Sequence, residues 1–383
     1  MNFNMNYFES SIDLHRKFQG KLAIQSLVPL ETRDDLSLAY TPGVAAPSEA
    51  IAKDKSLAYE LTMKGRTVAI VTDGSAVLGL GNIGPEAGLP VMEGKAILFK
   101  RFANIDAFPL CLATQNSDEI VETVKRIAPG FGAIQLEDIA APRCFEIEER
   151  LIRELDVPVM HDDQHGTAVV ILAGLLNALR VVEKSLKEVK IVISGSGAAG
   201  LASGRLLWDA GARFMTMIDS QGILAMGRNG MNAYKDEFAQ RINPENKQGT
   251  LTDAIQGADV FIGVSKANLV TSDMVRSMAK DPIIFAMANP SPEIMPDIAK
   301  EAGAAVIATG RSDFPNQVNN VLVFPGMFLG VLEGRLPKFT NTMRLAAAHA
   351  LAGMVEHPTR ERILPSALET DVARIVADAI KRA

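Results

Sequence analysis

The sequence predicts an α/β protein of two domains, the second of which is built on a doubly wound parallel sheet. The 383 residues exceed what one hydrophobic core usually organises, and 48% of them are apolar. Residues 189–219 form a strand, a helix and a strand around a glycine-rich turn, and apolar runs follow at 260–264, 283–287 and 306–309. Strands that alternate with helices are typical of a parallel sheet covered by helices on both faces. We place this second domain at residues 161–383.

The first domain, residues 1–160, is also expected to be α/β. Its first 20 residues are polar with scattered aromatics, and we expect them to be helical or irregular. Short apolar runs predict strands at residues 67–72, 97–99, 107–112 and 133–136. Helices are expected at residues 47–63 and 117–128, the second capped by Ser117 and favoured by the acidic residues that follow it.

Several helices are expected in the second domain. The segment after Gly166, AVVILAGLLNALRVVEK, is apolar around most of its circumference, which predicts a helix buried between layers. Residues 199–211 are expected to form the helix between the first two strands of this domain. The Ala-rich stretch 343–355 and residues 368–381 predict helices near the C-terminus.

Composition excludes several classes of protein. The net charge of −6 and the lack of a basic stripe argue against a nucleic-acid partner. The N-terminus lacks a basic and apolar signal segment, and the most apolar stretch, residues 168–176, is too short to span a bilayer. Cys111 and Cys144 form no CxxC pair and are expected to be reduced, buried packing residues. These features predict a cytoplasmic protein with no membrane partner.

Two acidic dyads, Glu137-Asp138 and Asp162-Asp163, each follow a short apolar run. If the runs are buried strands, both dyads lie at strand carboxyl ends, where open parallel sheets bind ligands. Four carboxylates meeting there would repel one another strongly unless a cation neutralised them. An all-oxygen shell suits Mg²⁺ or Mn²⁺. The alternative is that the dyads are loop acids or helix N-caps.

The pattern Gly-x-Gly-x-x-Gly occurs twice, and its context favours the second copy. That copy comprises Gly195, Ser196, Gly197, Ala198, Ala199 and Gly200. It follows an apolar run and can open a helix, so its N–H groups can approach a pyrophosphate. The next strand ends in Asp219, where an acid binds the ribose 2′-hydroxyl and disfavours a 2′-phosphate. This predicts a Rossmann-like domain that prefers NAD, with NADP as the alternative because Arg228 follows closely.

The first copy, at Gly79, Gly81 and Gly84, is followed by PEAGLP, which we expect to prolong a loop. Such a loop either forms a backbone wall over a small ligand or is simply a tight turn. Lys95 follows at the expected entry of an apolar strand, where burial would lower its pKa towards the range of a general base. A surface lysine is the alternative.

Further side chains with a chemical role are a tyrosine, two histidines and two asparagines. Tyr40 lies beside a Pro-Gly turn and is either a proton donor or a packing aromatic. His161 and His165 flank the second dyad, whose acids favour a harder metal than zinc, so we expect them to support ligands or to cap a helix. Asn289 and Asn320 border apolar runs, where an amide can hold a carboxylate or a carboxamide, or serve a turn.

Seven segments occur in order between residues 38 and 326: AYTPGVAAP, VTDGSAVLGLGNIGPEAGLPVMEGKAILFK, QLEDIAAP, HDDQHGTA, SGSGAAG, ANPSPEI and TGRSDFPNQVNNVLVFPG. Together they resemble the malic enzyme family in its compact bacterial form. The resemblance covers nearly the whole chain, and motifs of this length in this order are highly specific. It implies that the N-terminal α/β domain is of the malic type and that the second domain binds NAD(P).

The resemblance also implies roles for individual residues. Tyr40 matches the family's general acid, and Lys95 matches its general base at the substrate. Asp162 matches an acid that supports this lysine. Three positions match the metal ligands: Glu137, Asp138 and Asp163. Asn289 and Asn320 match residues at the substrate carboxylate and the nicotinamide.

The activity that the resemblance implies is oxidative decarboxylation of L-malate to pyruvate and CO₂, with reduction of NAD(P) and a divalent metal. Larger relatives carry an arginine where this chain has Ala76, so a different group is expected to hold that substrate carboxylate. A malolactic-type conversion to lactate would use the same residues. A nucleotide-binding module without catalysis and a dehydrogenase acting on amino acids are less consistent with the complete set of acids. A homodimer or higher homo-oligomer is the default assembly.

Overall fold

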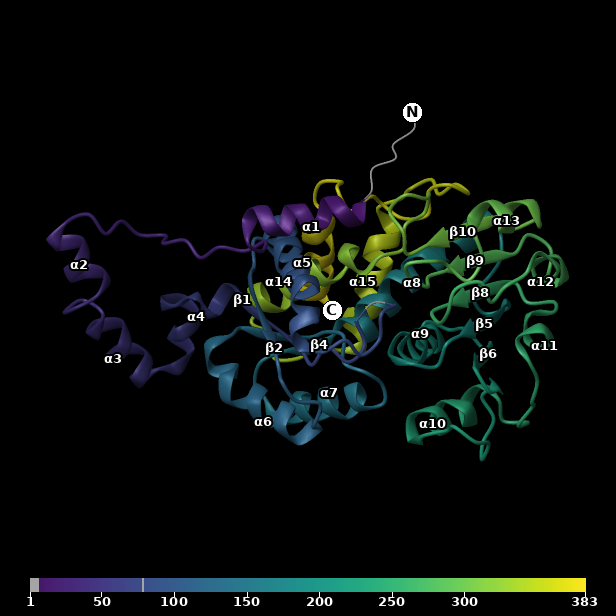
Figure 1. Cartoon of the computed structure of the whole chain (residues 1–383), viewed down its shortest axis with the longest axis horizontal. Coiled ribbons are helices and arrows are strands. Elements are labelled where there is room, and N and C mark those ends of the chain that lie inside the picture. The colour runs from purple at the N-terminus through teal and green to yellow at the C-terminus, as the bar shows by residue number, and fades with distance from the viewer. Residues whose placement is uncertain (1–6, 78) are drawn as a thin grey trace.

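The computed structural model describes residues 7–77 and 79–383. Two sheets lie side by side with helices around them, and an extended N-terminal arm projects beside the first sheet (Figure 1). The predicted α/β class is confirmed. Within the segment expected to be helical or irregular, helix α1 (Tyr7–Phe18) forms, and residues 1–6 lie outside the described residues.

The first sheet contains parallel strands in the order β2-β1-β3-β4. They are β1 (Thr67–Thr72), β2 (Asp106–Cys111), β3 (Ala133–Leu136) and β4 (Val159–His161). All residues of β1, β3 and β4 are buried, because helices cover both faces of the sheet. The strands expected at 67–72, 107–112 and 133–136 are therefore confirmed, with small shifts at their ends.

Helices α5 (Pro85–Ala103), α6 (Ser117–Ile127) and α7 (Arg143–Glu154) connect these strands. Right-handed crossovers place α5 on one face of the sheet and α6 with α7 on the other, because the chain reverses its direction across the sheet after β2 (Figure 1). Since β3 and β4 are parallel neighbours, their carboxyl ends meet at one edge of the sheet.

Helix α5 corrects two predictions. The loop expected after Gly84 and the strand expected at 97–99 both lie within this helix. Pro85 occupies its first position, where the missing N–H has no helical partner to lose. Met92, Ala96 and Phe99 then recur at helical spacing on the buried face. The run at 97–99 is too short to show this period, which appears only when its neighbours are included.

The helix expected at 47–63 is broken into shorter pieces. These are α3 (Ala45–Lys53), a 3₁₀ turn (Lys55–Leu57), α4 (Ala58–Leu61) and a second 3₁₀ turn (Met63–Arg66). Asp54 and Thr62 start the two 3₁₀ turns, because their side chains accept hydrogen bonds from N–H groups two residues ahead. The same chemistry makes Asn116, not Ser117, the N-cap of α6.

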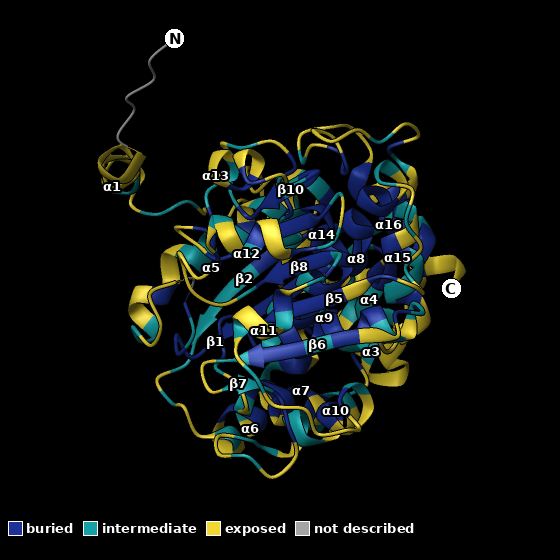
Figure 2. Ribbon diagram, turned by 90° about the vertical axis from the view of Figure 1, so that its right-hand side faces the viewer, coloured by how far each residue is buried: buried dark blue, intermediate teal, exposed yellow. Residues whose placement is uncertain are grey.

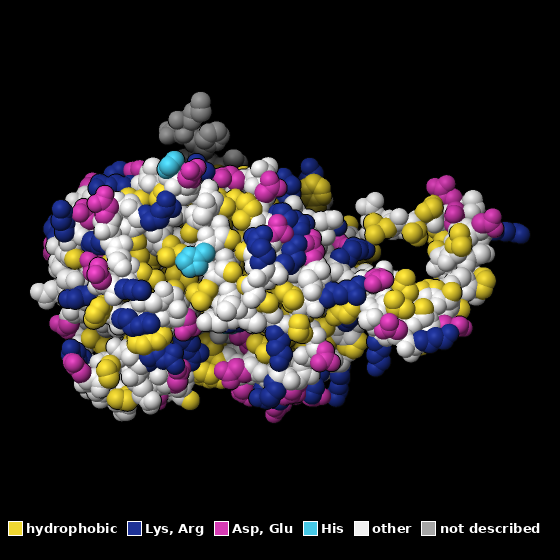
Figure 3. Space-filling view, turned by 180° about the vertical axis from the view of Figure 1, so that it is seen from behind, with side chains coloured by type: hydrophobic (Ala, Val, Ile, Leu, Met, Phe, Trp, Pro, Cys, Tyr) yellow, Lys and Arg dark blue, Asp and Glu magenta, His cyan; other side chains and the backbone are white. Residues whose placement is uncertain are grey.

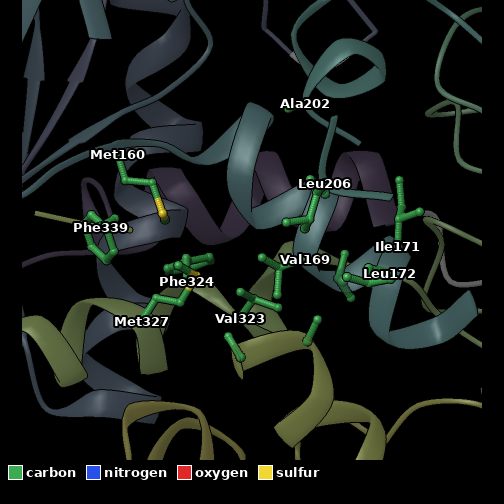
Figure 4. Close-up of a cluster of buried hydrophobic side chains, with 14 of the residues drawn as sticks. Met160, Val169, Ile171, Leu172, Ala202, Leu206, Val323, Phe324, Met327 and Phe339 are labelled. Atoms are coloured by element: carbon green, nitrogen blue, oxygen red, sulfur yellow. The ribbon is translucent and has the colours of Figure 1, made fainter. Parts of the chain in front are cut away.

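Helix α8 (Asp162–Val181) is the predicted buried helix, but it begins at Asp162, before the expected start after Gly166. It packs against α9 (Ala198–Asp209) and α15 (Asn341–Gly353). Figure 4 shows its apolar side chains, including Val169 and Leu172, among residues of α9 and of the C-terminal segment. The early start places the second acidic dyad in the first turn of this helix.

The second sheet has the strand order β10-β9-β8-β5-β6-β7. Its parallel strands are β5 (Lys190–Ser194), β6 (Phe214–Asp219), β8 (Val260–Gly263), β9 (Ile283–Ala286) and β10 (Val306–Thr309). The short β7 (Gly222–Ile223) pairs antiparallel with β6. The strand order reverses between β5 and β8, which is the switch point where doubly wound sheets bind ligands. The predicted doubly wound sheet is confirmed.

Helices surround this second sheet and enclose its buried strands (Figure 2). Besides α9, they are α10 (Ala233–Ile242), α11 (Leu251–Ile255), α12 (Ser272–Ser277) and α13 (Pro296–Glu301). Helices α14 (Phe324–Gly334) and α16 (Val372–Arg382) return to the first sheet, where the ring of Phe99 on α5 lies 4.8 Å from that of Phe324. The chain therefore crosses the division at residues 160 and 161 again, and that boundary stays a prediction.

The N-terminal arm carries exposed apolar side chains. Helix α2 (Arg33–Ala39) and helix α3 lie away from both sheets (Figure 1). Leu38 is 78% exposed and Tyr40 is 66% exposed. Figure 3 shows hydrophobic side chains on this projecting arm, at the right of the view. Such side chains lack the burial that usually stabilises a helix in a folded protein.

Two smaller predictions can also be compared with the structure. Cys144 is buried as expected, whereas Cys111 is only half-buried, and neither is in a disulfide. Among the described residues, no helix combines the length and apolar character needed to cross a bilayer. A cytoplasmic location stays a prediction.

Candidate active site

The two acidic dyads meet at the carboxyl ends of β3 and β4, as the sequence predicts. Glu137 and Asp138 follow β3 directly, and Asp163 lies in the first turn of α8, directly after β4. One carboxylate oxygen from each of these three residues lies within 4.8 Å of the others. This spacing suits three ligands of one cation, and the oxygen-only donor set suits Mg²⁺ or Mn²⁺.

Backbone contacts hold this cluster in place. Asp138 adopts a left-handed backbone with φ of 53°, which is sparsely populated by residues other than glycine. Its N–H donates to Asp163 Oδ2 at 2.8 Å, and its carbonyl accepts from the N–H of Ala76 at 2.9 Å. The loop after β1 is thereby joined to both dyads. Backbone strain of this kind is often found at functional sites.

The electrostatics of the cluster also fit a cation. Burial, together with the charges of the neighbouring acids, raises the pKa of Glu137 well above its ordinary value, and Lys95 offsets this only in part. The nearby protein groups therefore do not fully compensate a negative charge on Glu137, and its neutral form is favoured when no cation is bound. A divalent cation would supply the missing positive charge.

Lys95 reaches the cluster from α5. Its amino nitrogen forms an ion pair with Asp162 and lies 3.1 Å from Glu137 Oε1. The amino group also lies 4.6 Å from the ring centre of Phe324, at the start of α14. Its side chain is only 11% exposed, so the prediction of a buried lysine is confirmed and the surface lysine is excluded.

The pKa of Lys95 corrects the expected direction. Burial by itself lowers this pKa, but the charges of Asp162 and Glu137 outweigh burial and raise it. Gly166 makes room for this pair, because a Cβ at that position would lie 1.9 Å from Asp162 Oδ1. In the absence of other charges, Lys95 is therefore an ammonium ion and not a neutral base.

Asn320 lies beside the start of α8, and Asn289 lies against the first glycine loop. Asn320 begins a 3₁₀ turn (Asn320–Leu322) beside the first turn of α8, where a Cβ on Gly166 would lie 3.2 Å from its Cβ. Asn289 follows β9, and its carbonyl lies where a Cβ on Gly79 would come within 2.1 Å. The first glycine loop therefore makes a close backbone contact with the second sheet's loops. Gly79 is therefore needed here because a side chain would collide with the Asn289 carbonyl. The neighbouring Leu78 lies outside the described residues.

Tyr40 is not brought to the cluster within this chain. It follows α2 on the exposed arm, which projects away from α5, the helix that carries Lys95 (Figure 1). The structure therefore brings Lys95 together with all four acids of the two dyads, whereas Tyr40 lies apart from them.

The nucleotide loop has the geometry that its glycines predict. Gly195 has φ of +116°, and a Cβ on Gly200 would lie 1.8 Å from the carbonyl oxygen of Gly195, so no larger residue fits there. Gly197 has open space around it, as a surface that receives a phosphate requires. Helix α9 begins at Ala198, and its N-terminus points out of this loop. Ser196 Oγ donates to Asp219 Oδ2 at 3.3 Å, which joins the loop to the end of β6.

Comparison with models of protein families tests the resemblance that the sequence motifs indicate. Residues 19–152 match the model of the malic enzyme N-terminal domain, and residues 164–383 match that of the malic enzyme NAD binding domain. The chain belongs to the malic enzyme family.

Relatives with different cofactors are similar to this malic enzyme chain. The bifunctional malic/malolactic enzyme of Bacillus subtilis is 55% identical over 99% of this chain and 93% of its own. The NAD-dependent malic enzyme of Geobacillus stearothermophilus is 54% identical over 95% of this chain and 76% of its own. The NADP-dependent malic enzyme of Halomonas elongata is 48% identical over 93% of this chain and 84% of its own.

A solved malic enzyme structure has the same fold. The NAD-dependent malic enzyme of Thermotoga maritima superimposes with a TM-score of 0.94 at 49% identity, covering 97% of this chain and 98% of that one. The compact bacterial type and the two-part α/β architecture are therefore established for this chain.

Sequence reasoning missed a buried polar network behind the metal-site acids of this malic enzyme. Glu148 of α7 lies 2.9 Å from His165 Nε2 and accepts hydrogen bonds from the N–H of His161 at 2.7 Å and from Gln164 at 3.0 Å. His161 Nε2 in turn lies 3.1 Å from Asp163 Oδ2. The network therefore reaches Asp163, one of the three clustered acids. An isolated glutamate on a helix gives no sequence signal for this role.

A second missed residue is Glu293, which is completely buried after the ANPSP loop. Its carboxylate accepts from the N–H groups of Ser265 and Ala288, both at 3.0 Å. It therefore ties the loops after β8 and β9 together beside Asn289. The motif ANPSPE contains it, and an acid directly after a Pro-x-Pro segment is the signal that was available.

Proposed function

We propose specific roles for the side chains of this site in the malic enzyme reaction. That reaction is the oxidative decarboxylation of malate to pyruvate and CO₂, with reduction of NAD or NADP. The observation that carries the role assignment is the contact of Lys95 with Asp162 and Glu137, directly beside the three-carboxylate cluster. A base and a cation site that share a carboxylate can act on one hydroxyl group.

Glu137, Asp138 and Asp163 are the proposed ligands of the divalent cation, which we take to be Mg²⁺ or Mn²⁺. Bound there, it would supply Lewis-acid stabilisation of charge on a substrate oxygen, and its charge would offset the acids that raise the Lys95 pKa. Asp162 positions the lysine through their ion pair.

Lys95 is the proposed general base. Its amino group would accept the proton of the C2 hydroxyl of L-malate while the C2 hydride passes to the nicotinamide. Asn289 and Asn320 would hold the substrate carboxylate and the nicotinamide carboxamide. The bond between C3 and the C4 carboxylate then breaks, CO₂ leaves, and the resulting enolate takes a proton at C3.

Tyr40 is the proposed donor of that last proton, and we propose that a second copy of the chain brings it to the site. Its hydroxyl is exposed on an arm that carries further exposed apolar side chains, Leu36, Leu38 and Val44 among them. An apolar face on a projecting segment is typical of exchange between subunits. The proposed assembly is therefore a homodimer, or a higher oligomer built from it, in which each arm completes the partner's site.

Mixing two inactive variants tests this arrangement directly. Lys95→Ala and Tyr40→Phe would each be inactive alone. After the subunits are exchanged, a mixed dimer contains one site with both native residues, so about a quarter of the wild-type activity returns under random pairing. Activity that does not return, although mass measurements show mixed dimers, would place Tyr40 in the same chain's site or outside it.

The reaction is tested by the absorbance of reduced nicotinamide with L-malate and Mn²⁺, run with NAD and with NADP. We expect reduction that stops on addition of a chelator, with pyruvate as the product. Lactate without net nicotinamide reduction would support the malolactic alternative, which the similarity to the bifunctional Bacillus subtilis enzyme favours as a second activity. No product of either kind would contradict both assignments.

A further inference from the structure

One buried glutamate, Glu148 of α7, holds the chain on both sides of the second acidic dyad. Its Oε1 accepts a hydrogen bond from the N–H of His161, the last residue of β4, at 2.7 Å. Its Oε2 accepts from Gln164 Nε2 at 3.0 Å and lies 2.9 Å from His165 Nε2. Glu148 therefore contacts the residue directly before Asp162-Asp163 and the two residues directly after it.

These contacts require an ionised glutamate. Burial raises the pKa of Glu148, but the charges of His165, Arg344 and His161 outweigh burial and lower it to about 2. A carboxylate can only accept hydrogen bonds, and its neighbours around the dyad present N–H groups to it. The Glu148 side chain is only 6% exposed, so these donors, and not solvent, determine where its oxygens lie.

His161 extends this arrangement to the acidic cluster. Its Nδ1 lies 3.2 Å from Gln164 Nε2, the amide nitrogen that also donates to Glu148. A neutral His161 ring therefore accepts at Nδ1 and carries its proton on Nε2, and a protonated ring carries a proton there as well. In both states an N–H lies on the edge of the ring that is 3.1 Å from Asp163 Oδ2.

The start of α8 depends on this glutamate because the usual local restraint is absent. His161 is the N-cap of α8, and its side chain makes no capping hydrogen bond. In a capping box, the third helical residue would bond the N–H of the N-cap. That residue is Gln164, whose amide binds Glu148, and Glu148 bonds the N–H of His161 in its place. Asp163, in the same turn, is held further by the N–H of Asp138 at 2.8 Å.

We propose that Glu148 is a positioning residue for the divalent cation, which holds the ligand Asp163 in its binding orientation through His161 and the first turn of α8. Its hydrogen-bond partners around the dyad are not themselves proposed ligands. The inference rests on the proposed function, because it requires Asp163 to be a metal ligand. Groups that orient metal ligands typically contribute roughly 10–100-fold to metal affinity.

Mn²⁺ binding to the full chain without substrate tests this role, with free Mn²⁺ measured by electron paramagnetic resonance. Glu148→Gln should raise the Kd of Mn²⁺ by roughly 10–100-fold. At saturating Mn²⁺, kcat with malate should return close to the wild-type value, because Glu148 takes no part in the proton transfers. The Kd of NAD should stay unchanged. A glutamate that only stabilised the fold would lower the stability and leave the Kd of Mn²⁺ unchanged.

Glu149→Gln is the matched control, because it removes the same charge from the adjacent, exposed position on α7. It should bind Mn²⁺ like the wild type. His161→Phe keeps a ring but removes the N–H that faces Asp163, and it should also raise the Kd. If both residues act along one route, the double variant should weaken binding by less than the product of the two single effects. An effect equal to that product would overturn the route through His161.

Asp163→Asn separates this inference from the proposed function, because it changes the ligand itself. If Asp163→Asn binds Mn²⁺ like the wild type, the proposed metal site is wrong. If it loses Mn²⁺ while Glu148→Gln and His161→Phe bind normally, the positioning role is wrong and the metal site stands. If Glu148→Gln loses NAD affinity as well, helix α7 has been disturbed. His161→Phe then decides, since an unchanged Kd of Mn²⁺ would overturn the proposal and a raised one would support it.

Discussion

The amino nitrogen of Lys95 lies 3.1 Å from Oε1 of Glu137, so the proposed base and a proposed metal ligand touch each other. The pair couples proton transfer to the charge state of the cluster, because each group's pKa depends on the charge of the other. It also explains why a buried lysine is tolerated here, since buried charges persist only with partners.

Replacing this lysine should remove the oxidation step. Lys95→Ala is expected to lower kcat by roughly 10²–10⁴-fold, the usual contribution of a general base. Lys95→Arg should be similarly inactive, because it keeps the charge but cannot give up its proton. Malate-dependent nicotinamide reduction measures both variants. Lys100→Ala on the same helix, whose lysine is 53% exposed and pairs with Asp106, is the control and should stay active. Normal turnover by Lys95→Ala would refute the assignment.

Tyr40→Phe should impair catalysis without changing stability. Within this chain the Tyr40 side chain is exposed, so the thermal midpoint should not move. Turnover should fall by roughly 10²–10⁴-fold, because the enolate loses its proton donor. Thermal unfolding and steady-state rates would be measured together. Tyr7→Phe, which removes a hydroxyl from another exposed tyrosine, should leave both quantities unchanged. A loss of stability with full activity would assign Tyr40 a packing role at the subunit interface.

Glu148 should make stability depend on pH in acid. Burial raises its pKa, but His165 and the other cations outweigh burial and lower it from 4.5 to about 2. A lowered carboxyl pKa stabilises the fold above the unfolded value, and this stabilisation is lost as pH falls from about 4.5 towards 2. Between pH 5 and pH 3 the contribution should drop by about 2 kcal/mol.

Urea unfolding of the metal-free chain at these two pH values would measure that drop. Glu148→Gln should be less stable at pH 5 and should show a smaller loss between the two values. Glu149, at the adjacent position on α7, accepts a 3.4 Å contact from the Tyr234 hydroxyl and no further hydrogen bond among the described residues, so Glu149→Gln should behave like the wild type. Equal pH dependence in all three proteins would mean that Glu148 is not held ionised by its partners.

Gly200→Ala should weaken nucleotide binding. The new Cβ would lie 1.8 Å from the carbonyl oxygen of Gly195, so the loop and the start of α9 must separate. We expect the Kd of NAD to rise at least roughly tenfold, because the N–H groups no longer converge on one phosphate position. Gly353→Ala, a position with open space in α15, should bind NAD normally and be slightly more stable. Unchanged binding by Gly200→Ala would show that this loop does not carry the pyrophosphate.

The sequence by itself determined the features that depend on local pattern. Glu137 and Asp163 could be paired in advance, because each follows a buried strand and parallel strands present their carboxyl ends at one edge. The loop at Gly195 and Gly200 was likewise predictable, since close backbone contacts there admit no side chain. The seven ordered motifs between residues 38 and 326 then indicated the malic enzyme reaction.

The tertiary structure alone decided the features that depend on long-range contacts. The pKa of Lys95 rises because α5 points it at two acids that are distant in sequence, and the same helix was not recognisable from the short run at 97–99. The cofactor preference does not follow from Asp219 alone, because Arg228 and Lys235 both form ion pairs with its carboxylate. Tyr40 lies apart from the acidic cluster because the N-terminal arm that carries it projects away from both sheets (Figure 1). In each case the deciding energy is electrostatic or packing energy between segments, which no local period encodes.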